Sequence, residues 1–146
     1  MNKAESADLI LKLYDLRREP TMRAARNWML SFFPAGAADI MQAMIAQETS
    51  GHFRMVVTYW DMAASLVNHG AIDEEMFADA HNEHLVVFSK IELFLEEVRT
   101  TMNSPKFLLN LETLIMKMPD AKEILAARRE MMKRMFEARR EMAKNV

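Results

Sequence analysis

The spacing of the apolar residues is the feature that most limits the fold of this chain. From residue 6 onward, apolar side chains recur every three or four positions, which is the period of a helix that packs on a core. The three glycines and four prolines fall between these periodic segments and separate them. No segment alternates apolar and polar residues as a half-buried strand does. The sequence therefore predicts an all-α fold.

The length of 146 residues is close to that of one domain with one core. We expect residues 1–146 to form a single-domain bundle of about six to seven helices. The predicted helices cover residues 6–18, 22–32, 39–48, 52–69, 73–102, 104–118 and 120–142. The segment 52–69 is apolar around most of its circumference, so it is predicted to lie at the centre of the bundle.

The segment 73–102 is predicted to form a long fifth helix. Its apolar residues repeat at three and four for about thirty positions, which corresponds to roughly 45 Å of helix at 1.5 Å per residue. A break near His81 and Asn82 is the alternative. The last segment, from Asp120 to Met142, is predicted to form a long C-terminal helix.

Five sequence signals mark the expected helix ends. Ser6, Asp73 and the Ser104-Pro105 pair are predicted to begin helices, because short polar side chains accept bonds from first-turn amides and proline suits the first helical position. Asp120 and Glu123 have the spacing of a capping box. Gly70 is expected to end a helix with a positive φ angle.

Composition excludes several classes of protein. The chain has no cysteine, which rules out disulfide scaffolds and thiolate metal sites. The N-terminal residues do not resemble a signal peptide, and no apolar run approaches the ~18 residues that cross a bilayer. We therefore expect a cytoplasmic protein that neither enters a membrane nor binds one.

The charges are unevenly distributed along the chain. Residues 1–33 carry six basic against four acidic side chains, residues 34–119 carry five against twelve, and residues 120–146 carry eight against five. Acidic residues are interleaved with the basic ones in the last segment, whereas phosphate binding needs an uncompensated patch, so we predict no nucleic-acid binding. The basic segment is expected to meet the acidic middle of its own chain or of a second copy.

Methionine is abundant, with fifteen residues including Met1. Several of them fall on core stripes. There methionine either replaces leucine in the core or provides an adaptable binding surface. In the last segment an apolar seam consists of small or flexible residues: Ile124, Ala127, Met131, Met135, Ala138 and Met142. Such a seam is poorly packed in a monomer, and we predict a homo-oligomeric interaction or scaffold protein that self-associates through its C-terminal helix.

A line of polar residues interrupts the otherwise apolar segment 52–69. Its members, at spacings of four, three, four and three, are Arg54, Thr58, Asp61, Ser65 and Asn68. Either this line faces water, or it lines a cavity in which convergent polar groups orient a small ligand. In the second case the protein is a binding or sensor domain for an apolar acid or an anion. Arg54, Asp61 and His84 are the residues expected to face that ligand.

No cofactor, metal site or catalytic group is predicted. His81 and His84 stand three apart, but a catalytic metal needs at least three protein ligands, so His84 is interpreted as a partly buried core histidine and His81 as a surface one. No nucleophile lies beside a histidine and a carboxylate in a recognisable pattern, and phosphate loops are absent. Arg17, Arg18, Arg23 and Arg26 gather around Pro20, where they clamp an anion or form structural ion pairs.

Three stretches of the sequence carry a family resemblance. They are Leu13-Tyr14-Asp15-Leu16-Arg17-Arg18-Glu19-Pro20, Ala25-Arg26-Asn27-Trp28 and Gly70-Ala71-Ile72-Asp73. Together they resemble uncharacterised bacterial helical proteins of unknown function. The resemblance implies a helical fold over most of the chain and supplies no catalytic residues.

Overall fold

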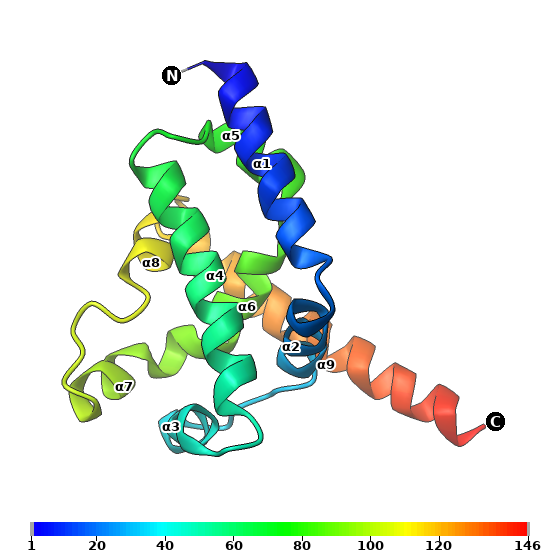
Figure 1. The fold of residues 1–146 in the computed structure, drawn as a ribbon. Helices are drawn as coiled ribbons and strands as arrows, with labels where there is room; N and C mark the ends of the chain where they lie inside the picture. Colours follow the sequence, from blue (N-terminus) through cyan, green and yellow to red (C-terminus); the bar gives the residue numbers. More distant parts are fainter. Residues whose placement is uncertain (1, 146) are drawn as a thin grey trace.

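The computed structural model describes residues 2–145, and all regular structure in that range is helical, as predicted (Figure 1). The elements are α1 Lys3–Arg17, α2 Pro20–Leu30, α3 Ala37–Ile45, α4 Ser50–Asn68, α5 Glu74–Ala80, α6 Glu83–Ile91, the 3-10 turn η1 Glu92–Phe94, α7 Leu95–Thr101, α8 Leu109–Ile115 and α9 Ala121–Lys144. Buried apolar residues from α1 to α9 form a hydrophobic core.

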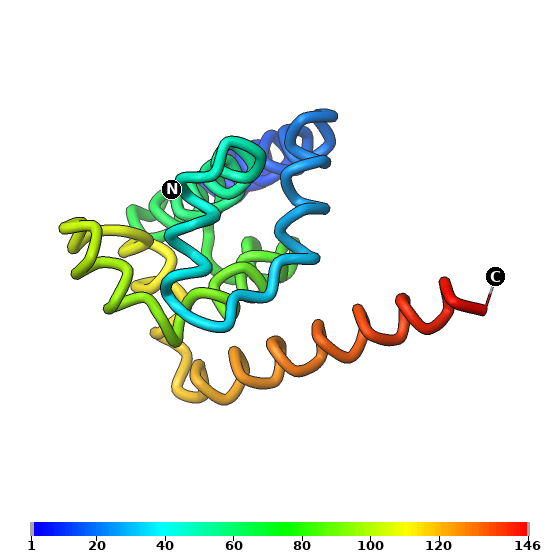
Figure 2. Tube along the Cα trace, turned by 90° about the horizontal axis from the view of Figure 1, so that it is seen from below, coloured from blue at the N-terminus to red at the C-terminus, as the bar shows by residue number. Residues whose placement is uncertain are grey.

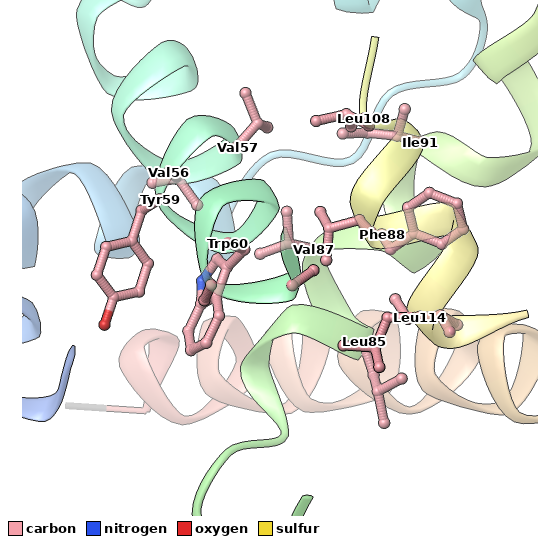
Figure 3. Packing of buried hydrophobic residues seen from close by; sticks show 14 of the residues in the cluster. Val56, Val57, Tyr59, Trp60, Leu85, Val87, Phe88, Ile91, Leu108 and Leu114 are labelled. Atoms are coloured by element: carbon pink, nitrogen blue, oxygen red, sulfur yellow. The ribbon is translucent and has the colours of Figure 1, made fainter. Parts of the chain in front are cut away.

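Helix α4 lies at the centre of this core, as its apolar circumference predicts. It packs against α2, α3, α5 and α8. Among its buried residues are Phe53, Val56, Trp60, Ala63 and Ala64, all with no exposed surface. Figure 3 shows side chains of α4 and α6 that point into the same core, such as Trp60 and Val87. The core therefore joins elements that lie far apart in the sequence.

Residues 73–102 are largely helical, but they do not form one continuous helix. Helix α5 ends at Ala80, and His81 follows in an extended conformation with φ −135° and ψ 132°. Helix α6 begins at Glu83, and the 3-10 turn Glu92–Phe94 separates it from α7. The break at His81 and Asn82, the alternative left open by the sequence, is therefore the one observed.

Two of the predicted helix ends are confirmed. The Asp73 carboxylate accepts a hydrogen bond from the Met76 N–H at 3.0 Å, which caps α5. Gly70 has a φ of 82°, a backbone conformation that residues with a side chain rarely adopt. The tight turn between α4 and α5 is thus built as the sequence predicts.

The helix start predicted at Ser6 is wrong. Asn2, not Ser6, caps α1, because its side chain accepts from the Ala4 and Glu5 N–H groups. Ser6 is buried within α1, and its hydroxyl accepts from the Asp73 N–H at 3.0 Å. It therefore connects α1 to the loop before α5 instead of starting a helix.

The chain between α7 and α8 also departs from the prediction. Ser104 and Pro105 lie in turns, and α8 begins only at Leu109, after Leu108 in the left-handed region at φ 54°. Helix α9 does begin directly after Asp120, as predicted, but the Asp120 side chain makes no capping bond there, so the predicted capping box is absent. Leu108 and Leu111, at the start of α8, are both buried in the core.

Helix α9 is the long C-terminal helix that the sequence predicts. Its 24 residues correspond to roughly 36 Å at 1.5 Å per residue. The first half packs on α6 through Ala121 and Leu125, while the second half extends away from the other helices (Figure 2). Within residues 2–145, no helix is both long enough and apolar enough to cross a bilayer.

Candidate functional site

Arg54 and Asp61, two of the residues predicted to face a ligand, lie in different surroundings on α4. Arg54 is exposed on α4, where its Nε donates to the Ser50 carbonyl at 3.2 Å and its side chain borders an open groove. Asp61 does not border that groove. Its carboxylate accepts from the Leu111 N–H and from the Asn110 side chain, both at 3.0 Å. Asp61 therefore holds the first turn of α8, and the structure does not bring it together with Arg54.

A polar cluster lies inside the molecule where α1, α2, α4 and the α5–α6 break meet. One of its contacts joins Arg17 Nη1 and His81 Nδ1, which are 3.1 Å apart. The Arg17 guanidinium also lies 5.5 Å from the ring of Trp60. His81 is only 2 % exposed, so its interpretation as a surface histidine is wrong. The break after Ala80 turns this ring inward.

Glu83 is the acidic member of this polar cluster. Arg26 binds it with two parallel hydrogen bonds, Nε to Oε2 and Nη2 to Oε1, both 2.9 Å. The indole N–H of Trp60 donates to the same carboxylate at 3.2 Å. Such forked pairs are stronger than single contacts, and the bond to Glu83 raises the pKa of Arg26. Arg26 is therefore part of a structural ion pair and not of an anion clamp.

His84, the third residue predicted to face a ligand, is buried beside His81. The Phe77 ring centroid is 5.0 Å from that of His81 and 5.1 Å from that of His84. Burial lowers the pKa of each histidine to about 4, with positive charge from Arg17 contributing at His81 and from Arg128 at His84. Both rings are therefore neutral at physiological pH.

These two histidines border a cleft of about 500 Å³ between α5, α6, α8 and α9. We call it the histidine cleft. Its walls are mainly apolar and include Phe77, Leu85, Ile115, Met118 and Ile124. Arg128 of α9 stands at its edge, and no carboxylate of residues 2–145 pairs with that guanidinium. Within the same range, no group of three histidine, aspartate or glutamate side chains is arranged to hold a metal.

Lys90 is another buried ionisable group, and no pattern in the sequence indicated its burial. It is 5 % exposed, and its Nζ donates to the Phe32 carbonyl at 2.7 Å and to the Leu30 carbonyl at 3.3 Å. Burial lowers the pKa of this amine to about 8. The side chain thus satisfies carbonyl groups at the end of α2, beside a cavity of about 240 Å³.

The outer half of α9 exposes most of the predicted seam. We use the name outer seam for Met131, Met135, Ala138 and Met142, of which the methionines are 39 %, 54 % and 71 % exposed. The opposite side of this helix contacts the body, where Phe136 meets Phe33 with ring centroids 5.4 Å apart. Closer to the body, Arg129 pairs with Glu92 at 3.0 Å. The basic helix thus meets an acidic residue of its own chain, as expected.

A family model described as a domain of unknown function, DUF4760, matches residues 3–118. The chain belongs to this family. The resemblance to an uncharacterised helical family is therefore confirmed. No curated protein and no solved structure matches the chain. The matched range of DUF4760 contains α1 to α8 and includes His81 and His84, and α9 follows it.

Proposed function

We propose that this DUF4760 protein is a homo-oligomeric interaction protein, whose copies associate through the outer seam of α9. The observation that carries the proposal is the exposure of Met131, Met135 and Met142 on a helix that extends beyond the body (Figure 2). Apolar side chains in a continuous stripe lose free energy when they leave water. A partner helix is the group that covers such a stripe most completely.

The length of the unsupported helix gives a second reason for a partner. From Lys133 to Asn145, Phe136 is the one residue that is not classed as exposed. Isolated helices shorter than about 12–15 residues are marginal in water even for favourable sequences. Pairing with a second helix supplies the packing that this part of α9 does not obtain from its own chain.

The charges beside the outer seam favour an antiparallel pair of α9 helices. The seam positions are spaced four, three and four, so in an antiparallel pair Met131 lies opposite Met142 and Met135 opposite Ala138. This arrangement places Arg134 near Glu141 of the second copy. A parallel pair instead places Arg134 near Arg139 of the second copy, where two like charges repel.

A single buried charge tests the proposal. In Met135→Glu the new carboxylate has to leave water when the seam is covered, so we expect the dissociation constant of the oligomer to rise by roughly a hundredfold or more. Analytical ultracentrifugation over a concentration series measures it. Met62→Glu is the matched control, because Met62 is 44 % exposed on α4. A wild-type protein that sediments as a monomer at every concentration, or equal association of both variants, contradicts the proposal.

A further inference from the structure

Two imidazole nitrogens in the polar cluster have no hydrogen-bond partner among residues 2–145: His81 Nε2 and His84 Nδ1. The proton on His81 can be assigned from its neighbour. An arginine only donates, so His81 Nδ1 accepts from Arg17, and the ring proton of the neutral imidazole is on Nε2. A buried N–H donor is thus left unsatisfied, which in a folded protein calls for a specific explanation.

Both His81 and His84 border the histidine cleft, and 2 % and 6 % of their respective surfaces are exposed. The cleft volume of about 500 Å³ is within the range of small-molecule sites. Sites of that kind combine apolar walls with a few converging polar groups. The histidine cleft has this composition, with His81, His84 and Arg128 as the converging groups.

The charges around the cleft favour an anion. Positive charge from Arg17 acts on His81, and positive charge from Arg128 acts on His84. The carboxylates nearby are already paired, Glu83 with Arg26 and Glu74 with Lys117 at 3.1 Å. Neither Arg17 nor Arg128 has a carboxylate partner among residues 2–145, and of these two Arg128 is the one that borders the cleft.

We propose that the histidine cleft binds a medium-chain monocarboxylate. Its carboxylate accepts hydrogen bonds from His81 Nε2 and from the Arg128 guanidinium, and its hydrocarbon chain packs against the apolar walls. Because His81 Nε2 is shielded, binding requires side chains of the cleft wall to shift, and the flexible Met118 is one of those side chains. This site is separate from the outer seam, so either proposal can fail alone.

Octanoate is the probe for this site, with octanol as the uncharged match. We expect octanoate to raise the thermal midpoint and to shift the imidazole ¹⁵N resonances of His81 and His84, while octanol binds at least tenfold more weakly. Arg128→Gln keeps the apolar stem of the side chain and removes its charge. It is expected to weaken octanoate binding tenfold or more in calorimetric titration, because the charge-assisted bond is lost.

Lys122→Gln is the control on the same helix, since Lys122 is exposed and does not border the cleft. Its octanoate affinity should equal that of the wild type. Equal affinities for octanoate and octanol, or an unchanged affinity in Arg128→Gln, would show an apolar surface without a carboxylate site and overturn the proposal. An octanoate titration that leaves both imidazoles unshifted also overturns it.

Discussion

The two buried histidines, His81 and His84, make the free energy of unfolding depend on pH. A histidine has a pKa near 6.5 in an unfolded chain, whereas burial lowers the pKa of His81 and His84 to about 4. Between these values the unfolded chain binds protons that the folded chain does not. The free energy of unfolding is therefore fully retained above about pH 6.5 and decreases as the pH falls towards 4.

We predict that His84→Gln has a shallower loss of stability over this range than the wild type. Each buried histidine contributes up to about 1.4 kcal/mol per pH unit, because it accounts for one proton. Urea unfolding at pH 7, 6 and 5 measures the slopes. His69→Gln is the control, since His69 is exposed. Identical slopes in the wild type and in His84→Gln would be evidence against a neutral, buried His84.

The contacts of single side chains could be predicted where the partner is close in the sequence. Asp73 caps the amide three positions later, and local spacing is enough to predict that. The contact between Arg17 and His81 spans 64 positions, and that between Arg26 and Glu83 spans 57. No local pattern encodes such pairs, so the polar cluster could not be predicted.

At the scale of elements, apolar spacing failed to predict the break between α5 and α6 but did predict the helix α9. The apolar spacing continues through residues 73–102, yet the backbone leaves the helix at His81, where that ring meets Arg17 and the neighbouring Glu83 meets Arg26. Tertiary contacts override the local pattern there. In α9 the apolar spacing was sufficient to predict the helix. It could not predict that the second half extends away from the other helices, because that depends on how those helices are arranged in space.

The antiparallel arrangement of α9 makes a prediction about charge exchange. Arg134→Glu alone and Glu141→Arg alone should each weaken association, because each places like charges together in the pair. The double variant Arg134→Glu/Glu141→Arg should recover it, since the opposite charges face each other again. Sedimentation of the three variants at low salt measures the effect. Failure of the double variant to recover association would exclude this arrangement.

At the scale of the whole molecule, stability should be graded from α4 outward. Helix α4 carries the most completely buried side chains, while the outer half of α9 has few contacts with the body. We predict that amide exchange is slowest in α4 and fastest beyond Lys133 in dilute protein. At high concentration the outer amides should slow while those of α4 do not. Mass-spectrometric hydrogen exchange at two concentrations measures this.

The all-helical class and the central position of α4 could be predicted because they depend on the apolar period summed over many residues. The candidate sites could not. Arg54 and Asp61 share a helical line, yet the line passes from open solvent near Arg54 to the first turn of α8 near Asp61. His84 was identified for its position on a core stripe, whereas most residues that border the histidine cleft with it come from other elements.

The reactivity of the buried Lys90 amine can be used to measure local opening of the structure. With a pKa of about 8, a sizeable fraction of this amine is already unprotonated in mildly alkaline buffer, so protonation does not protect it. Its protection comes from burial and from the carbonyl groups of Leu30 and Phe32. An amine-reactive reagent therefore modifies Lys90 only when the amine leaves these two carbonyl groups, and the rate of acylation measures how often it does.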